Sequence, residues 1–362
     1  MAPIKLGLIG LSAGGSWASR AHLPYFSKTD KYEIVALLNR SVESGKKAAE
    51  NYNLSGVACY DKIDALLKDS NVDLIALSVK VPDHYEIAKP ALEAGKDIFI
   101  EWPLAANLKQ AEELTSLAKS HKVKNLVGLQ ARQDPSILKA RELVLNGNLG
   151  DILGTTMTGH GGLFGPQATP YFEYMFPVEH GANLVTIPFG HAVDALCYVL
   201  GEFKDLQATL ANNRPKVDVV DEAGKHLRTV DKTSHDHLAL TGTLQRGGVA
   251  TVVYQPATSL TGHNFYWEIN GTKGSLVLEA SSGHIQMFHP TIKFVSTEKD
   301  AKLKEIEVEA PSEFSYNVGQ AWDAFAGNGE GTVTTFEDAL LRHKMIEAIY
   351  RSDEKGTRES YL

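Results

Sequence analysis

The first 125 residues alternate between strand-like and helix-like segments, and this alternation narrows the folds open to the chain more than any other feature. Strands that alternate with helices along a chain form a parallel sheet with helices on both faces. The sequence therefore predicts a doubly wound parallel sheet. Its strands are expected at 5–10, 34–38, 74–79, 97–100 and 125–130, with helices at 43–52 and 84–94 among the crossovers.

After residue 130 the alternation ends and a different pattern begins. One helix is expected at 135–145, followed by strands at 155–159, 236–244, 249–255, 266–269 and 275–278. Runs of strands with few helices between them favour a mostly antiparallel sheet. We therefore expect an α/β protein with two domains, over residues 1–130 and 131–362. Within the second domain, the polar segment 211–231 is expected to be a loop or excursion, and 336–352 an amphipathic helix.

Composition excludes several classes of partner. The chain has 362 residues, 43% of them hydrophobic, which is enough to bury a full core. A net charge of -8 without a basic stretch opposes binding to nucleic acid or anionic membranes. Because no apolar run suggests a signal segment or a membrane span, we expect a cytoplasmic protein. Cys59 and Cys197 are expected to be small apolar residues, and no metal site is expected, because the histidines lack ligand spacing.

A glycine-rich turn follows the first predicted strand and precedes a helix. The backbone amides of such a turn can approach a pyrophosphate, and the helix amino terminus stabilises its charge. The spacing departs from a strict G-x-G-x-x-G, since Ser12 takes the place of the second glycine, so a merely flexible connection is the alternative. The candidate dinucleotide ligands in this turn are Gly10, Ser12, Ala13, Gly14, Gly15 and Trp17.

The end of the second strand bears on the choice of cofactor. An acidic residue there would bind the adenosine ribose, but this chain has Asn39, Arg40 and Ser41. Arg40 and Ser41 can hold a 2'-phosphate through charge and a hydroxyl group, so we hypothesise NADP(H), with NAD(H) as the alternative. Arg40 can equally be read as a solvated turn residue. Further candidate cofactor contacts lie at the ends of later strands: Val79, His84, Glu101, Trp102, Pro103 and Gln130.

An ordered set of motifs covers nearly the whole chain. It comprises the Gly10 turn, Val81-Pro82-Asp83-His84, Glu101-Trp102-Pro103, Gly190-His191-Ala192-Val193-Asp194 and Ile269-Asn270-Gly271-Thr272-Lys273-Gly274. In this order the motifs resemble the glucose-fructose oxidoreductase/inositol dehydrogenase (Gfo/Idh/MocA) family. The resemblance implies an amino-terminal Rossmann domain, a carboxyl-terminal α/β domain whose open sheet often mediates oligomer contacts, and a nicotinamide cofactor. The glycine turn and the Glu-Trp pair look most like the fungal galactose-pathway regulators, which act by protein contact.

The catalytic residues of that family are only partly present. Typical members use the lysine of a Glu-Lys-Pro tripeptide and a histidine in the pattern Asp-x-x-x-His. Here His191 matches, but position 102 is Trp and position 187 is Ile. Neither side chain can replace the charged or polar group, so the usual route of sugar-alcohol dehydrogenation is disfavoured. Trp102 could instead form a flat apolar wall beside the nicotinamide, as the biliverdin reductase branch suggests.

The proton donor and the roles of three polar residues stay open. Protonation would fall to His191, to a tyrosine of the segment 171–174 such as Tyr174, or to water, although His191 could also be a capping or packing residue. His84 is expected to anchor its helix beside the cofactor. Arg132 is expected to hold either a substrate oxygen or a local carboxylate.

Two functions follow from these observations. The first is an oxidoreductase that uses NADP(H) or NAD(H) and acts on a carbonyl or hydroxyl group of a sugar-like or aromatic small molecule. The second is an inactive dinucleotide-binding transcriptional regulator with a protein partner, which would extend its location to the nucleus. A homo-oligomer is expected in either case, because an exposed sheet face commonly finds a symmetric partner.

Overall fold

The computed structural model describes residues 2–327 and 332–362, and the chain forms two compact units. The amino-terminal unit comprises Met1–Gln130 and Glu313–Leu340, and the carboxyl-terminal unit comprises Ala131–Ser312 and Leu341–Leu362. The break after Gln130 coincides with the boundary expected from the sequence. The segment 313–340 belongs to the amino-terminal unit. The domain ranges expected from the sequence placed it in the second domain.

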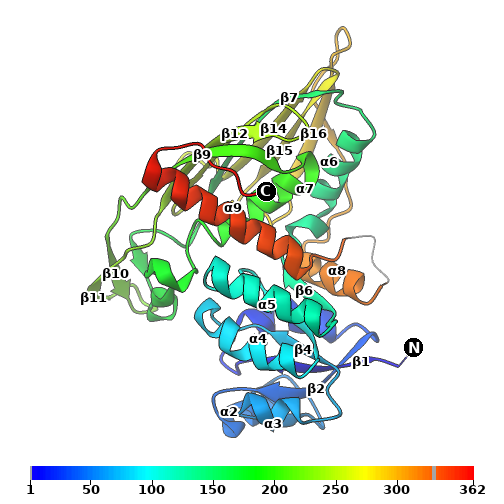
Figure 1. The fold of residues 1–362 in the computed structure, drawn as a ribbon, viewed down its shortest axis with the longest axis vertical. Helices are drawn as coiled ribbons and strands as arrows, with labels where there is room; N and C mark the ends of the chain where they lie inside the picture. Colours follow the sequence, from blue (N-terminus) through cyan, green and yellow to red (C-terminus); the bar gives the residue numbers. More distant parts are fainter. Residues whose placement is uncertain (1, 328–331) are drawn as a thin grey trace. The chain divides into compact units, whose positions relative to one another are not determined.

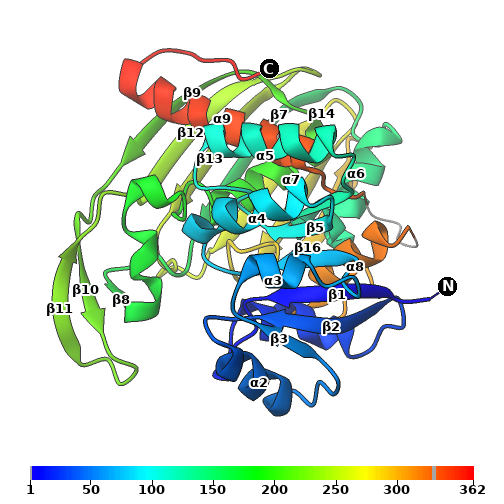
Figure 2. The ribbon, with the colours of Figure 1, turned by 60° about the horizontal axis from the view of Figure 1, so that its bottom comes forward.

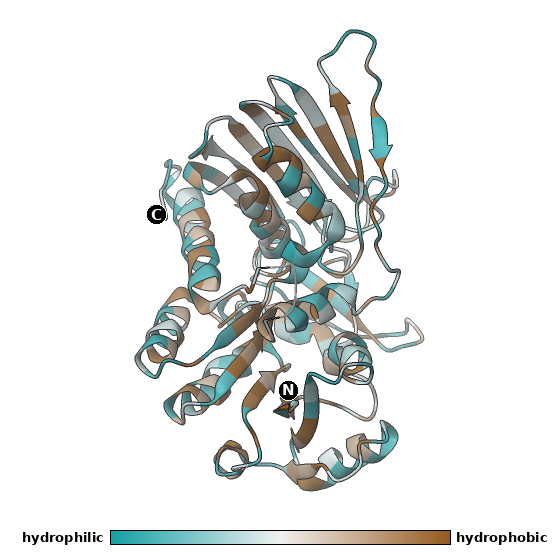
Figure 3. Cartoon of the chain, turned by 90° about the vertical axis from the view of Figure 1, so that its right-hand side faces the viewer, coloured by the Kyte–Doolittle hydropathy of each residue, from teal (hydrophilic) through white to brown (hydrophobic). Residues whose placement is uncertain are grey.

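The amino-terminal unit is built on a parallel sheet with strand order β3-β2-β1-β4-β5-β6. This is the strand order of a Rossmann fold, and it confirms the doubly wound sheet. The parallel strands are largely hydrophobic (Figure 3), because both faces of the sheet are covered. The strands are β1 (Ile4–Ile9), β2 (Tyr32–Leu38), β3 (Ala58–Tyr60), β4 (Leu74–Leu77), β5 (Asp97–Glu101) and β6 (Asn125–Gly128).

Short polar sequences fix where the helices of this unit begin. Ser41 and Ser44 form a capping box at the start of α2, and Asn107 accepts a hydrogen bond from the Gln110 amide at the start of α5. The helices are η1 (Ala18–His22), α1 (Leu23–Phe26), α2 (Val42–Asn51), α3 (Ile63–Leu67), η2 (Val81–Asp83), α4 (His84–Glu93), α5 (Leu108–Ser120) and α8 (Tyr316–Phe325).

The returning segment 313–340 completes the core of the amino-terminal unit. Trp322 of α8 is fully buried, and its ring stacks on Phe99 of β5 with centroids 4.6 Å apart. The Val127 amide of β6 donates to the Thr334 carbonyl at 2.8 Å. These contacts make the segment part of the parallel-sheet core.

The carboxyl-terminal unit contains an eight-stranded, mostly antiparallel sheet, as the sequence predicts, with one parallel pair between β7 and β13. Its order is β17-β16-β15-β14-β7-β13-β12-β9. Buried residues alternate with half-exposed or exposed ones along β9, β12 and β13, so one sheet face is solvated. The strands are β7 (Ile152–His160), β9 (Phe203–Ala211), β12 (His237–Leu244), β13 (Val249–Gln255), β14 (Phe265–Gly271), β15 (Gly274–Ala280), β16 (Thr291–Ser296) and β17 (Lys304–Ile306).

A second, three-stranded sheet projects away from the large one (Figure 2). It consists of β8 (Gln167–Ala168), β10 (Lys216–Val220) and β11 (His226–Asp231). Of the two alternatives expected at 211–231, the loop was therefore wrong, and the segment is an excursion that contains two strands. Val217 and Val219 alternate inward and pack with Phe176, which gives this small sheet its own core.

The remaining helices of the chain include one that is almost entirely buried, α7 (Pro188–Leu200). The others are η3 (Gln130–Gln133), α6 (Pro135–Leu145), η4 (Pro170–Met175), η5 (Val178–His180) and α9 (Phe336–Lys355). In the part of the chain that the structure describes, none of the helices has the length and hydrophobicity needed to cross a membrane.

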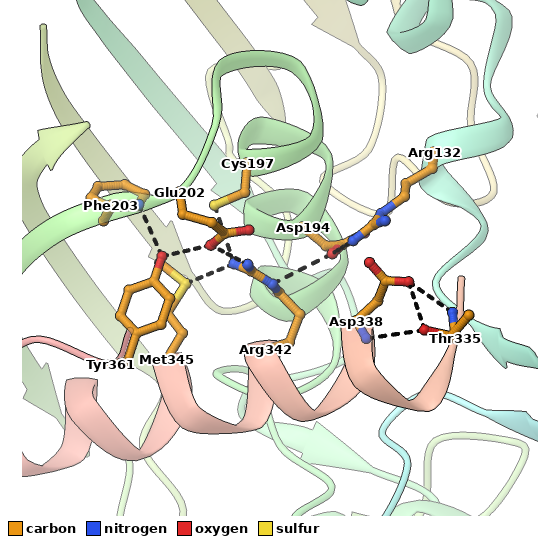
Figure 4. A network of polar contacts seen from close by, with 10 residues as sticks. All are labelled: Arg132, Asp194, Cys197, Glu202, Phe203, Thr335, Asp338, Arg342, Met345 and Tyr361. Carbon is orange, nitrogen blue, oxygen red and sulfur yellow. Dashed lines mark hydrogen bonds and ion pairs between the residues drawn. The ribbon is translucent and has the colours of Figure 1, made fainter. Parts of the chain in front are cut away.

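A buried ionic network surrounds α7 (Figure 4). Arg132 binds both carboxylate oxygens of Asp194 at 2.7 Å, and the Nε atom of Arg342 lies 3.5 Å from the same carboxylate. Arg342 also pairs with Glu202, whose carboxylate accepts a hydrogen bond from the Tyr361 hydroxyl at 2.7 Å. The network joins α7, α9 and the end of the chain.

Removal of Arg342 should strongly destabilise the carboxyl-terminal unit. Arg342 is 1% exposed, and Arg342→Met would leave Glu202 and Asp194 short of a cation, at a cost of about 3–5 kcal/mol. Arg358→Met is the matched control, because that side chain is 55% exposed and pairs with Asp205 at the surface. Thermal denaturation measures the stability that each variant loses, and hydrogen exchange of the α7 amides shows whether the loss includes this helix. Equal losses in Arg342→Met and Arg358→Met would contradict a stabilising role for the buried network.

Candidate functional site

The expected cofactor residues of the amino-terminal unit gather at one edge of its sheet. They follow β1, β2, β4, β5 and β6, whose carboxyl ends meet at the same edge because the strands are parallel. Ligands of open α/β sheets bind outside this edge, where the strand order reverses between β1 and β4.

The turn after β1 is shaped by Gly10. Its φ of +100° is in the region that glycine favours, and a Cβ atom there would overlap the carbonyl oxygen of Ser78. Gly15 also has a positive φ, of +95°, and nothing lies within 4 Å of the place a Cβ would take. The Gly15 amide donates to the Ser12 carbonyl at 3.1 Å, which closes the turn. The turn thus brings backbone close to β4 and leaves open space beside Gly15.

Around the turn after β1, three buried polar atoms have no hydrogen-bond partner among the described residues: the Ser78 hydroxyl oxygen, Oδ1 of Asn39 and Nε1 of Trp17. Buried polar groups in folded proteins are nearly always paired, so three orphans around one turn indicate a site built for a polar ligand. Ser78 was not among the residues expected from the sequence, since a serine within an apolar run carries no local signal. These atoms and the Gly10 turn fit a dinucleotide.

The segment after β2 presents Arg40 to solvent. Asn39 is held in place because its side-chain amide donates to the Leu11 carbonyl at 2.6 Å. Ser41 uses its hydroxyl oxygen to accept the Ser44 amide at 3.1 Å, so it serves first as the cap of α2. Its hydroxyl donor and the exposed Arg40 guanidinium are both compatible with a bound phosphate.

The segments after β4 and β5 are tied together by His84. This fully buried side chain faces the Pro103 carbonyl at 2.9 Å and the Val79 carbonyl at 3.1 Å, and burial lowers its pKa. His84 thus anchors the start of α4, as its sequence position suggested. Trp102 is 4% exposed, and Glu101 is hydrogen-bonded to His22 at 2.5 Å. Gln130, after β6, is 2% exposed and its Oε1 has no partner.

His191 lies in the carboxyl-terminal unit, on the first turns of α7. Its side chain is 4% exposed, and its Nδ1 is buried without a hydrogen-bond partner among the described residues. Burial, with a contribution from the neighbouring His284, lowers the pKa of His191 to about 3, so its imidazole is neutral near pH 7. The His191 amide donates to the Ile187 carbonyl, so positions 187 and 191 lie one helical turn apart, as an Asp-x-x-x-His motif requires.

His284 is a second buried histidine that the sequence analysis missed. The Gln286 side-chain amide donates to its Nδ1 at 3.1 Å, and its Nε2 therefore donates to the Gly161 carbonyl at 2.5 Å. Burial also lowers the pKa of His284. His284 lies close enough to His191 to affect its pKa, although the two residues are more than 90 positions apart in the sequence. No local sequence pattern can predict that they are neighbours.

Two other expected residues have local partners. Tyr174 lies on η4, where its ring contacts Tyr171 and its carbonyl accepts from His180; burial raises the pKa of its hydroxyl. Arg132 is bound to Asp194, so the local carboxylate, rather than a substrate oxygen, is its partner. In the described ranges 2–327 and 332–362, no three His, Cys, Asp or Glu side chains form a group that could hold a metal ion.

Comparisons with known proteins match both units. A model described as an oxidoreductase family with an NAD-binding Rossmann fold matches residues 4–129, and one described as the Gal80p C-terminal domain matches residues 135–280. The dehydrogenase aclE of Aspergillus oryzae is 34% identical over 99% of this chain and 98% of its own. The galactose/lactose metabolism regulatory protein GAL80 of Kluyveromyces lactis is also 34% identical, over 81% of this chain and 67% of its own.

Solved structures agree with these sequence matches. A super-repressor mutant of Gal80p from Saccharomyces cerevisiae superimposes with a TM-score of 0.92 at 28% identity, over 99% of this chain and 98% of its own. The similarity therefore extends through both units to a dehydrogenase and to regulatory proteins alike.

The depressed pKa of His191 predicts a specific dependence of stability on pH. Below about pH 6.5 the unfolded chain binds a proton at this histidine, whereas the folded chain does not until the pH nears 3, so stability falls as the pH falls through that window. Between pH 7 and pH 5 the wild type should lose about 2 kcal/mol of unfolding free energy through His191, and His191→Gln should not have this loss. Denaturant unfolding of both proteins at the two pH values measures the difference.

His263→Gln supplies the control for that experiment. His263 is exposed and lies in the connection between β13 and β14. This variant should keep the wild-type pH dependence. An unchanged pH dependence in His191→Gln would show that His191 is not buried in its neutral form.

Proposed function

The chain belongs to the Gfo/Idh/MocA family of oxidoreductases with an NAD-binding Rossmann fold, and from this premise we propose that it is a dinucleotide-dependent dehydrogenase with a nonstandard catalytic site. The single observation that carries the proposal is the buried, neutral imidazole of His191, whose Nδ1 has no partner in the part of the chain that the structure describes. A dehydrogenase aligned along nearly the whole of both chains supports it.

The residues of the first unit would hold the cofactor. The Gly10 turn would receive the pyrophosphate, Asn39 and Ser41 the adenosine ribose, and the Ser78 hydroxyl a further polar group. The bound dinucleotide would supply the hydride acceptor. The substrate class we propose is a sugar-like or aromatic alcohol, which becomes a carbonyl compound.

His191 would take the proton that leaves the substrate hydroxyl. Its imidazole is neutral near pH 7, and its Nδ1, which has no partner among the described residues, is free to accept that proton, although the lowered pKa makes the ring a weaker base than an exposed histidine. Trp102 and Ile187 place apolar groups where typical members have Lys and Asp, so these two positions cannot assist the proton transfer. Turnover is expected to depend on His191 more than in those enzymes.

Turnover tests this proposal directly. Purified protein with NADP+ or NAD+ and a panel of aldoses, sugar alcohols and aromatic alcohols should show growth of the reduced-nicotinamide absorbance. His191→Ala should lower kcat/KM by about 10²–10⁴-fold, the usual contribution of a general base. Tyr174→Phe is the control and should leave the rate near wild type. Oxidation that survives loss of His191 would contradict the assigned role.

We further propose a preference for NADP(H), which rests on Arg40. Its exposed guanidinium follows β2, where NAD-specific proteins place a carboxylate. Arg40→Ala should weaken NADPH binding by about 10–100-fold, the value of a charged hydrogen bond to phosphate, and leave NADH binding unchanged. Titration calorimetry with both nucleotides measures this. Equal losses for both, or tighter NADH binding by the wild type, would contradict the preference.

A second candidate function is that of a regulator that binds a dinucleotide and a protein partner without turnover. The match of residues 135–280 to the Gal80p C-terminal domain and the loss of the usual Lys and Asp favour it. Tight nucleotide binding with no oxidation across the alcohol panel, together with a saturable protein partner, would support the regulator over the enzyme.

We also propose that the solvated face of the large sheet joins two copies of this chain. Thr241 of β12 and Thr251 of β13 are paired neighbours on that face, half-exposed and uncharged. Thr241→Glu with Thr251→Glu would bring like charges of both copies together at a symmetric contact and should shift the protein to monomer in sedimentation velocity. A wild-type protein that sediments only as monomer at micromolar concentration would contradict this assembly.

A further inference from the structure

Glu101 is held by two buried residues that the sequence analysis did not single out. Nε1 of Trp322 lies 3.0 Å from Nδ1 of His22, and Nε2 of His22 lies 2.5 Å from Oε1 of Glu101. Trp322 and His22 are both 0% exposed and Glu101 is 9% exposed. All three belong to the amino-terminal unit.

The chemistry of these side chains fixes the position of the His22 proton. An indole N–H can only donate, so Nδ1 of His22 must be the acceptor and carries no hydrogen. The single imidazole proton therefore lies on Nε2 and is donated to Glu101. A doubly protonated His22 would set two N–H groups against each other at 3.0 Å, so the Trp322 contact keeps His22 neutral.

The Glu101 carboxylate consequently has no cationic partner within the described residues. Its ion-pair contact there is with His22, which is neutral for the reason above. His84 also lies near enough to sense the Glu101 charge, but its two ring nitrogens face the carbonyl oxygens of Pro103 and Val79, not the Glu101 carboxylate. A buried carboxylate without a cation is costly, unless a ligand supplies the positive charge.

The position of Glu101 indicates which ligand this is. Glu101 is the last residue of β5, which pairs with β4 at the binding edge of the sheet. Its partner on β6 is Gly128, and a Cβ atom at Gly128 would lie 2.7 Å from Oε2 of Glu101. Gly128 thus leaves room for the carboxylate at this edge.

We propose that Glu101, kept as an uncompensated carboxylate by the positioning residues His22 and Trp322, makes the site prefer the oxidised dinucleotide over the reduced one. Oxidised nicotinamide carries a positive charge and reduced nicotinamide does not, so a nearby buried carboxylate binds the oxidised ring more tightly. The inference rests on the proposed dinucleotide function, and it adds a redox preference that matches oxidation of the substrate.

Two variants and one matched control test this. Glu101→Gln should weaken NADP+ binding by about tenfold, while NADPH binding changes by less than about twofold. Trp322→Phe keeps the ring stack but removes the N–H donor, so His22 can become a cation, and the preference should fall toward that of Glu101→Gln. Trp267→Phe removes an equivalent buried indole hydrogen bond, to Thr155 in the other unit, and should change neither affinity.

A spectroscopic readout separates positioning from general stability. In ¹⁵N NMR of the full chain, the His22 signals, assigned by their loss in His22→Asn, should show a neutral ring with its proton on Nε2. This pattern should persist in Trp267→Phe and change in Trp322→Phe. A cationic His22 in the wild type would overturn the redox preference but not the proposed function. A Glu101→Gln variant that keeps the wild-type ratio of NADP+ to NADPH affinity would do the same.

If neither NADP+ nor NADPH binds to the wild type, both the redox preference and the proposed function are overturned.

Discussion

The buried carboxylate of Asp194 organises the carboxyl-terminal unit. It receives a bidentate hydrogen bond from Arg132 and lies 3.5 Å from Arg342 (Figure 4). The chain enters the carboxyl-terminal unit twice, after Gln130 and after Leu340. Arg132 is the second residue after the first of these points, and Arg342 is the second residue after the other. Asp194 therefore ties the start of each of these two segments to α7. His191 lies three residues earlier on the same helix, so its placement depends on this carboxylate.

Burial, rather than direct charge pairing, controls the chemistry of the candidate site. Burial lowers the pKa of His191, His84 and His284, because desolvation disfavours the imidazolium. In the amino-terminal unit, the donor geometry of Trp322 keeps His22 neutral, so the Glu101 carboxylate accepts a hydrogen bond from a neutral ring. Typical members of the family have a charged lysine and an aspartate where this chain has Trp102 and Ile187. A buried carboxylate that faces a neutral histidine is suited to a cationic cofactor.

Sequence patterns predicted the features that depend on local structure. Five strands of the parallel sheet, the Gly10 turn and the long helix at 336–352 follow from periodicity and from the conformational needs of glycine, whereas the three-residue strand β3 is too short to show a period. The small sheet was missed because β10 has only five residues and β11 is mostly polar and exposed, so the inward alternation is limited to Val217 and Val219. The Arg132–Asp194 pair was left open because an arginine has the same appearance in sequence whether it binds a carboxylate or a substrate. His22 and Trp322 are 300 residues apart, so their contact appears only in the folded chain.

All of the proposed chemistry depends on a dinucleotide bound at the turn after β1. Titration calorimetry of NADPH into the wild type and into Gly10→Ala tests this most directly. Gly165→Ala is the control, since Gly165 lies in the other unit and a Cβ there would make an ordinary contact, 3.5 Å from Cβ of Ala257. We expect saturable binding by the wild type and none by a folded Gly10→Ala variant, because the added methyl group would displace the turn from Ser78. Wild-type affinity in Gly10→Ala, with its circular dichroism spectrum unchanged, would contradict binding at this turn.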